Sequence, residues 1–421
     1  MGVRSRSKSI TLPRAGGGGG GADLISELSD DLLVRVLEVL PDARDAVRTH
    51  ALSRRWRALW TRVAVLRFDS DTRRREFREP GGPGRFVAFV DHALALRAAE
   101  KEPALEHLEI SFDLSVHEEE ASSDPEQLVP PSTEAAQRWI RYAMQHEVKS
   151  LTFKVDLPLP LFNDEADDDD DFYSGNNVMT LDDLPFSSAK LETMRLNLSA
   201  VRLRLPSTAA FASLTDLSLE NMEVGAGGGR LLGRLVSSAC CPRLHRLRLV
   251  GLELAEMEEE EPPLLIDAGA LLELLLLEFD ELLFLQLRTP SLRVLHVKGC
   301  YELEELTVSA PRLEDVKFLV RQPLHIDGDL SSVARLEIEL SSSQGYLGDD
   351  RNDGSIRLLE CCSLIRCLEV SVDVPERKQQ DVDIIKGSIP QLPHVASLKI
   401  HVTLRERRCS YAAGGIASLL A

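Results

Sequence analysis

Residue types that could do chemistry are present in this chain, but they are scattered along its 421 positions. None of the ten histidines has a second histidine at metal-ligand spacing, and no Cys-x-x-Cys pair occurs among the seven cysteines. Neither the G-x-S-x-G turn of a serine hydrolase nor the H-E-x-x-H helix of a zinc protease appears. The sequence therefore predicts no catalytic residues, no metal site and no cofactor, which indicates a protein that is not an enzyme.

Two segments could suggest ligand chemistry but favour simpler interpretations. Residues 164–171 are an acidic run within the stretch 163–177, and carboxylates are ligands for Ca²⁺. The run lacks the glycine turn and the alternating spacing of a calcium loop, so we expect a solvated loop insertion. Residues 225–233 are rich in glycine, as phosphate-binding loops are, but no lysine follows in the required order. They predict a turn between repeats.

The balance of charge excludes further classes of protein. With 49 basic and 68 acidic residues the net charge is −19, which argues against general binding to nucleic acid. Ten arginines fall between positions 44 and 75. They could contact a phosphate or an acidic partner, although a solvated helix face is the favoured interpretation. No apolar run is long enough to span a membrane, and the cysteine pattern is typical of a reducing compartment, so we expect the nucleus or the cytoplasm.

The elements that could position a partner-binding surface begin at residues 23–60, which predict three short helices. Ser29 can cap the first helix, Pro41 ends it, and Asp42 can cap the second. So short a segment cannot bury all of its large aliphatic and tryptophan side chains. The excess of apolar side chains indicates a surface that a partner covers.

The order and spacing of these residues resemble the F-box of plant F-box proteins. The stretch opens D-L-I-S-x-L-x-D-D-L-L, closes its first helix with Leu-Pro and ends D-A-V-R-T-x-A-L-S-R-R-W-R-x-L-W. The resemblance implies that the module binds a Skp-family adaptor, which links it to a cullin–RING ubiquitin ligase, the SCF complex. One departure is Ser29, where most F-boxes have proline; we expect the helix to survive and one apolar contact to the adaptor to be lost. By the resemblance, the residues that face the adaptor or pack the module are Leu28, Leu32, Leu33, Val36, Leu37, Leu40, Pro41, Val47, Leu52 and Trp56.

A repeated pattern runs through the rest of the chain. Its template is L-x-x-L-x-L-x-x-N/C, the strand and turn of a leucine-rich repeat, and successive copies start 20 to 43 residues apart. The last two apolar positions of a copy lie on one side of a strand, and stacked copies give a parallel sheet on the concave wall of a solenoid. The two gaps of 43 residues predict a degenerate copy in each. The copies begin at Leu105, Val148, Leu191, Leu214, Leu244, Leu272, Leu292, Leu313, Val333, Ile365 and Val395.

The organisation of the whole chain follows from these two signals. Residues 85–97 and 134–145 predict amphipathic helices, each before a strand, which suits a solenoid with helices on its convex side. This order resembles grass-type F-box proteins with leucine-rich repeats. The predicted fold class is α/β, with a disordered leader at 1–22, a three-helix F-box at 23–62 and an irregular leucine-rich-repeat solenoid at 63–421.

The resemblance implies a substrate-recognition subunit of an SCF-type ubiquitin ligase, which binds a Skp-family adaptor through the F-box and a target protein through the repeats. The alternative is a repeat scaffold that acts outside a ligase. Neither interpretation involves nucleic acid or a membrane. We also expect the F-box and the repeats to bury separate cores, so that Leu33→Asp or Leu37→Asp abolishes adaptor binding and leaves the repeats folded. The residues expected to line the concave wall are Arg195, Asn197, Arg246, Arg248, His296, Lys298, Asp315, Lys317, Glu337 and Glu339.

Overall fold

The computed structural model describes most of the chain between residues 25 and 405. The described residues are 25, 27–70, 81–99, 105–113, 129–156, 178–181, 187–199, 201–225, 227–254, 263–320, 324–341, 352–375 and 392–405. The predicted leader at 1–22, the acidic insertion at 163–177 and the arginines at 73–75 lie outside them. Within these ranges, no helix has both the length and the apolar character needed to cross a membrane.

Short helices form the N-terminal module, as the sequence predicts. Ser29 caps α1 (Asp30–Glu38), since its hydroxyl accepts from the amide of Leu32 at 3.4 Å. Asp42 caps α2 (Ala43–Arg48) in the same way, at 2.8 Å. The module continues through η1 (Thr49–Ala51), α3 (Trp56–Leu59) and η2 (Trp60–Arg62), and both predicted caps are confirmed.

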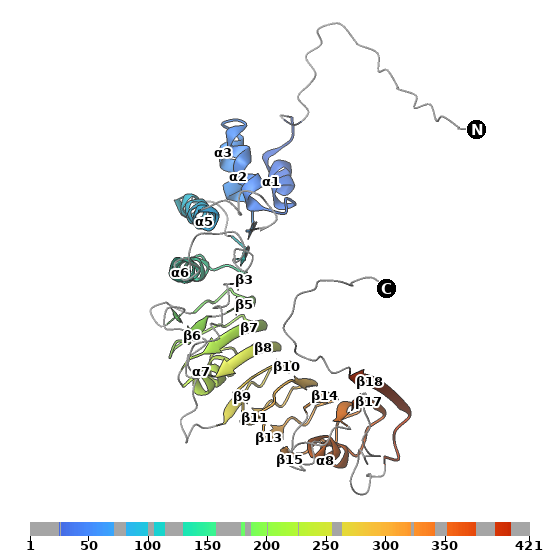
Figure 1. The fold of residues 1–421 in the computed structure, drawn as a ribbon. Helices are drawn as coiled ribbons and strands as arrows, with labels where there is room; N and C mark the ends of the chain where they lie inside the picture. The colour runs from blue at the N-terminus through green and yellow to red at the C-terminus, as the bar shows by residue number, and fades with distance from the viewer. Residues whose placement is uncertain are drawn as a thin grey trace, which may run out of the picture.

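A long parallel sheet follows the module and lines the concave side of a curved solenoid (Figure 1). This confirms the predicted fold class. Two short strands, β4 (Val178–Thr180) and β6 (Arg202–Arg204), pair beside the main path. The main path is β1 (Val65–Asp69), β2 (His107–Asp113), β3 (Ser150–Asp156), β5 (Thr193–Ser199), β7 (Asp216–Val224), β8 (Arg246–Leu254), β10 (Glu273–Leu277), β12 (Val294–Lys298), β14 (Asp315–Leu319), β16 (Arg335–Ser341), β17 (Cys367–Pro375) and β18 (Ser397–Arg405).

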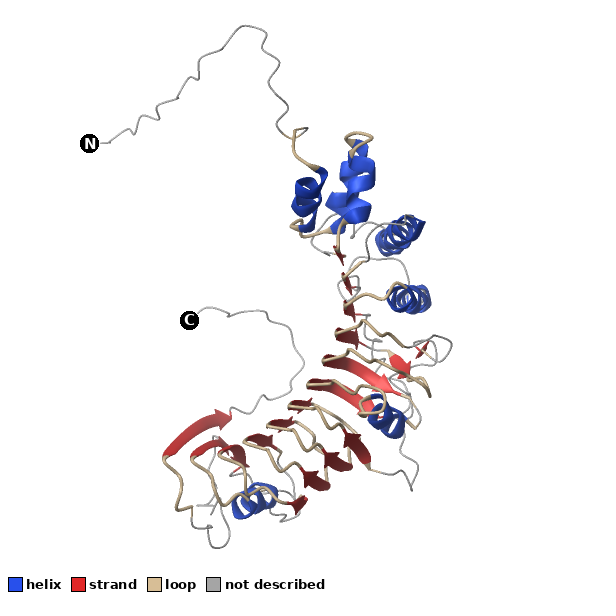
Figure 2. Ribbon diagram, turned by 180° about the vertical axis from the view of Figure 1, so that it is seen from behind, coloured by secondary structure: helices blue, strands red, loops and turns tan. Residues whose placement is uncertain are grey.

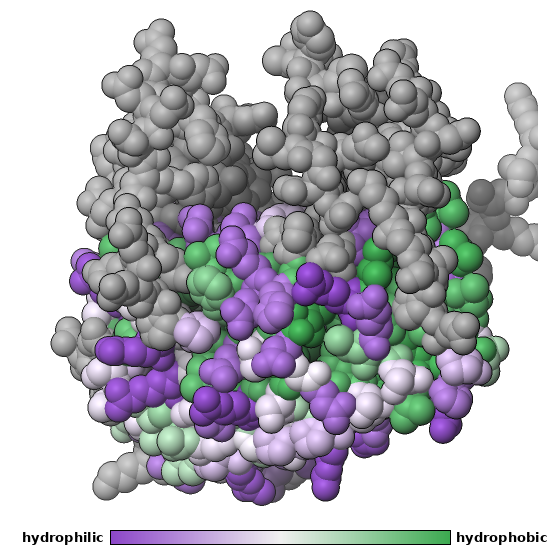
Figure 3. Space-filling model, turned by 90° about the horizontal axis from the view of Figure 1, so that it is seen from below, coloured by the Kyte–Doolittle hydropathy of each residue, from purple (hydrophilic) through white to green (hydrophobic). Residues whose placement is uncertain are grey.

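The convex side is built differently along its length (Figure 2). Helices cover it at α5 (Gly82–Ala99), α6 (Val129–Gln145), α7 (Gly228–Leu235) and α8 (Asp353–Cys361). Between α7 and α8 a second parallel sheet takes their place, with strands β9 (Leu264–Asp267), β11 (Phe284–Arg288), β13 (Glu305–Ser309) and β15 (His325–Gly328). Seen from below, hydrophilic and hydrophobic residues are interleaved on the surface (Figure 3).

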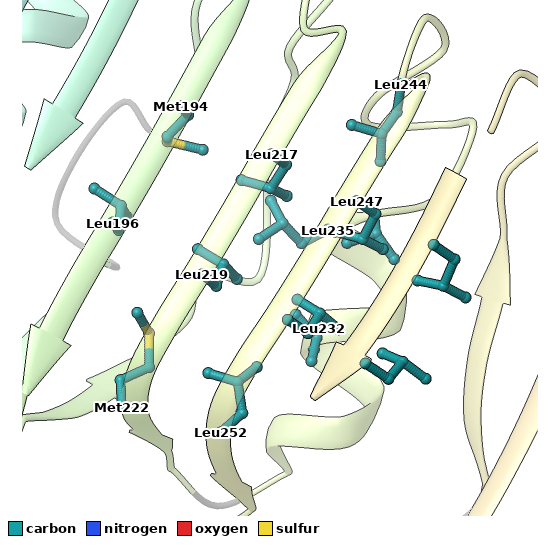
Figure 4. Packing of buried hydrophobic residues seen from close by; sticks show 14 of the residues in the cluster. Met194, Leu196, Leu217, Leu219, Met222, Leu232, Leu235, Leu244, Leu247 and Leu252 are labelled. Atoms are coloured by element: carbon teal, nitrogen blue, oxygen red, sulfur yellow. The ribbon is translucent and has the colours of Figure 1, made fainter. Parts of the chain in front are cut away.

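The helices at 85–97 and 134–145 are confirmed, with wider bounds, but the predicted turn at 225–233 is wrong. Gly228 begins α7, and Leu232 and Leu235 pack against the sheet beside Leu247 and Leu252 (Figure 4). The glycines serve close packing: a Cβ on Gly233 would lie 2.4 Å from the carbonyl oxygen of Leu265.

Two details of the predicted repeat register are also wrong. The copy that starts at Leu272 is shifted by one residue, because Leu274 and Leu276 are the buried residues of β10 and pair with Leu247 and Leu249 of β8. The gaps of 43 residues hide no extra copy among the described residues. There β2 pairs directly with β3, and β3 with β5. The first of these units is long because it contains the helix α6.

The buried side chains form one continuous cluster from the N-terminal module to β17. Leu33 and Leu37 belong to it together with Leu66 and Phe68 of β1. At the junction, the carboxylate of Glu38 accepts from the amide of Ala64 at 3.1 Å. The expectation of two separate cores is therefore wrong, because α2 packs directly on β1 and the buried side chains of α1 belong to the same cluster.

Candidate interaction surfaces

An apolar face of α1 is left uncovered. Leu32 and Val36 are each 53% exposed, Leu28 is 36% exposed, and Val39 at the end of the helix is 82% exposed. Leu32 and Val36 are spaced by four residues, so they fall on one side of the helix, and Leu28 directly precedes the capping residue Ser29. Leu52, which is also exposed, comes from the turn before α3. Large aliphatic side chains gathered in this way are typical of a protein-binding surface.

The ten residues that the F-box resemblance implies divide into two groups. Leu33 and Leu37 are 1% and 3% exposed and point into the core, so they hold the module together. Leu40, Val47 and Trp56 are partly buried against the same core. Leu28, Leu32, Val36, Pro41 and Leu52 are exposed. The predicted set does not include Val39, which caps the C-terminal end of the helix.

Ion pairs fix the exposed face in place. Arg55 donates to the carboxylate of Asp30 at 2.7 Å and to the backbone oxygen of Leu28. Arg62 pairs with Asp31 at 3.2 Å. These arginines tie the start of α1 to the helices that follow it, so part of the arginine-rich stretch has a structural task in this surface.

The second candidate surface is the concave wall. All ten predicted lining residues lie on the main sheet in positions that alternate with buried residues, and each is half-buried or exposed. Ion pairs cross from strand to strand: Arg248 to Glu220 at 3.4 Å, Arg335 to Asp315 at 2.8 Å, and Lys317 to Glu337 at 2.8 Å. The hydrogen bond to Glu337 raises the pKa of Lys317 above its usual value. The wall is thus polar and largely charge-matched.

The wall also holds groups that sequence reasoning missed. Val250, Leu275, Leu277, Val294 and Leu319 are half-buried and face the concave side of β8, β10, β12 and β14. The one-residue error at β10 hid two of them, because it placed Leu275 and Leu277 in the core. His296 lies among them, and burial lowers its pKa.

The described residues hold no cluster of three or more His, Cys, Asp or Glu side chains that could bind a metal ion. The two surfaces consist instead of exposed apolar side chains and paired charges. Such surfaces bind other molecules by contact and charge complementarity.

Comparison with known proteins identifies relatives of this chain. No family model matches the chain. An Arabidopsis thaliana protein named among the FBD-associated F-box proteins is 28% identical over 328 residues, which cover 76% of this chain and 66% of the relative. An FBD-associated F-box protein of the same plant is 29% identical over 77% of this chain and 68% of its own length. An F-box/FBD/LRR-repeat protein, also from Arabidopsis thaliana, is 30% identical over 48% of this chain and 37% of its own length.

The chain thus spans about two thirds, or less, of the length of these curated relatives. The matches agree with the α/β architecture of short N-terminal helices and a long parallel solenoid. The chain is thus a distant homologue of plant FBD-associated F-box and F-box/FBD/LRR-repeat proteins.

Proposed function

We propose that the chain is the substrate-recognition subunit of an SCF-type cullin–RING ubiquitin ligase. The N-terminal module binds a Skp-family adaptor, and the solenoid binds a target protein. The observation that carries the proposal is the uncovered apolar face of α1, where Leu32 and Val36 stand out from the core. Family membership supports the choice of adaptor.

The mechanism is proximity. The chain does no chemistry itself; it raises the effective concentration of the target beside the ubiquitin-loaded enzyme that another subunit holds. The continuous core supports this role, because it fixes the target-binding wall relative to the adaptor-binding face.

The test compares two faces of α1 in the full chain. Leu32→Asp and Val36→Asp place a charge on the exposed face, and we expect each to weaken adaptor binding at least about tenfold while the fold stays intact. Leu364→Asp is the matched control, since Leu364 is a 48% exposed leucine on the turn before β17. Binding to a recombinant plant Skp-family adaptor is measured by calorimetry, and folding by circular dichroism.

Adaptor binding by the wild-type chain and by Leu364→Asp, but not by the two α1 variants, would support the proposal. If the folded wild-type chain does not bind the adaptor, or if the α1 variants bind like wild type, the proposal is wrong.

A further inference from the structure

The middle of the concave wall carries an apolar strip. Val250, Leu277, Lys298 and Leu319 are register neighbours on β8, β10, β12 and β14, so they form one row across four strands. Leu275 lies two residues before Leu277 on the same side of β10, beside His296. These aliphatic side chains are half-buried by their neighbours and keep one side open to the concavity. We call this row, with Leu275, the concave strip.

Most of the arginine and lysine side chains on this wall form ion pairs with carboxylates of the same molecule. Cations meet anions of the neighbouring strand between β7 and β8, as in Arg246 with Asp216, and between β14 and β16, as in Lys317 with Glu337. Glu273 is the register neighbour of Arg246, whose pKa is raised by its hydrogen bond to Asp216 and further by Glu273.

Two cations are left over. Arg195 on β5 and Lys298 on β12 are exposed, and neither side chain has an ion pair or hydrogen bond among the described residues, although the charge of Arg195 lowers the pKa of Asp216 on the next strand. Arg195 stands on the N-terminal side of the concave strip, and Lys298 stands within it. A ligand that runs from β5 to β12 would therefore meet one exposed positive charge at Arg195 and a second at Lys298.

The spacing of these charges sets the geometry of such a ligand. In the order β5-β7-β8-β10-β12, four inter-strand steps separate Arg195 from Lys298. At about 4.8 Å a step the separation is about 19 Å, which an extended peptide spans with about six residues. The apolar side chains of β8 and β10 lie at the Lys298 end of that path, and the Arg248–Glu220 pair lies at the Arg195 end.

We propose that the concave strip binds an extended acidic segment of a target protein, with two carboxylates about six residues apart and one or two aliphatic or aromatic side chains just before the second carboxylate. The first carboxylate pairs with Arg195 and the second with Lys298, and the apolar side chains pack on Leu275, Leu277 and Val250. This rests on the proposed function, for which it specifies the class of target.

The probe is a phage-displayed library of random peptides of about twelve residues, selected on the full chain. We expect the selected sequences to carry the acidic pair at the stated spacing with an apolar residue between. Lys298→Glu should weaken binding of the selected peptides at least about tenfold. A lysine in place of the second acidic residue of a peptide should restore its binding to this variant. Leu277→Ser should weaken them as well. The control is Lys399→Glu, because Lys399 lies on the concave side of β18 outside the strip.

Selection of peptides without an acidic pair, or binding that is unchanged by Lys298→Glu, would overturn the inference. Adaptor affinity of the same preparations separates the two proposals. A chain that binds the adaptor but selects no such peptide contradicts only the inference, whereas a chain that selects the peptides without binding the adaptor contradicts only the ligase role.

Discussion

Ser29 shows how one residue can depart from a family pattern at little cost. It stands where most F-boxes have proline, and its backbone has φ −66° and ψ 154°. Proline fixes φ near that value, so Ser29→Pro fits the chain without strain. The variant loses the hydroxyl cap on the amide of Leu32, which lowers the free energy of unfolding by about 1 kcal/mol. Proline also restricts the unfolded chain, which raises the free energy of unfolding by about the same amount.

We therefore expect Ser29→Pro to be as stable as wild type and to bind the adaptor at least as well. Ser29→Ala is the comparison, since it removes the cap without the proline constraint and should be less stable by about 1 kcal/mol. Urea unfolding followed by circular dichroism gives both values. A proline variant less stable than the alanine variant would show that the proline ring strains the chain at this position, because both variants lack the hydroxyl.

Glu253 offers a test in pH. It is the register neighbour of Glu223 on β7, and its backbone forms an isolated parallel β-bridge with Asp280. Burial raises the pKa of Glu253, and the carboxylates of Glu223 and Asp280 raise it further. Because the folded chain holds this proton more tightly than the unfolded chain, ionisation of Glu253 is unfavourable in the fold. The penalty is absent below the unfolded pKa of about 4.3 and grows as the pH rises through the folded value.

Glu253→Gln should thus stabilise the chain at pH 7, by less than about 1 kcal/mol because the group is only partly buried. The gain should shrink as the pH is lowered toward 4, where Glu253 itself is protonated. Urea midpoints at several pH values measure it, with Glu304→Gln as an exposed control. A gain that does not depend on pH would mean that the carboxylate cluster is not its cause.

At the scale of the element, four neighbouring strands, β7, β8, β10 and β12, reach a residue in the left-handed region at matching positions. Asn221 and Gly251 lie within β7 and β8, with φ of 53° and 57°, and Glu278 and Gly299 directly follow β10 and β12, with φ of 52° and 71°. A Cβ on Gly251 would also lie 2.5 Å from the side-chain oxygen of Asn221. Gly251→Ala should therefore destabilise the solenoid by about 1–2 kcal/mol.

Gly84→Ala is the matched control for that change. Gly84 lies in α5, and a Cβ there meets nothing within 4 Å, so alanine should be neutral or stabilising. Thermal unfolding of both variants gives the comparison. Equal effects of the two substitutions would remove the left-handed turn as the explanation.

The sequence predicted the elements well where one pattern had one solution. The residues Leu292, Leu295 and Val297 fit a single register, and β12 has that register. Residues 271–277 fit two registers, because nearly every position is leucine, and only pairing with Leu247 and Leu295 selects Leu274 as buried. The convex side could not be predicted in the same way. Helix α7 depends on contact with β9, a strand that is distant in sequence from the glycines of the helix.

The site could be predicted in part for a similar reason. The apolar stripe of α1 was visible, but periodicity alone does not say which side of an amphipathic helix faces the core when both carry leucines. Leu33 and Leu37 face inward because α3 and η2 pack on that side of α1, whereas Leu32 and Val36 stay exposed. That division is a property of the tertiary packing.

At the scale of the whole molecule, one arginine joins the N-terminal module to the repeats. Arg44 of α2 is buried, and its guanidinium pairs with Asp42 at 2.7 Å. It also donates to the backbone oxygen of Asp69 at the end of β1 and lies over the ring of Phe86 of α5, 6.0 Å from its centre. Arg44 therefore contacts the module, the first strand and the first convex helix at once.

Arg44→Ala removes the cation that faces a buried carboxylate, which should cost about 3 kcal/mol. Because the core is continuous, the loss should appear on both sides of the junction. Hydrogen exchange measured by mass spectrometry should show faster exchange in 30–62 and in 65–99 together. Arg62→Ala, which breaks partly exposed pairs with Asp30 and Asp31, should change exchange little. Faster exchange in 30–62 alone would mean that the module unfolds independently, so that the target would be held on a loose joint rather than at a fixed position relative to the adaptor.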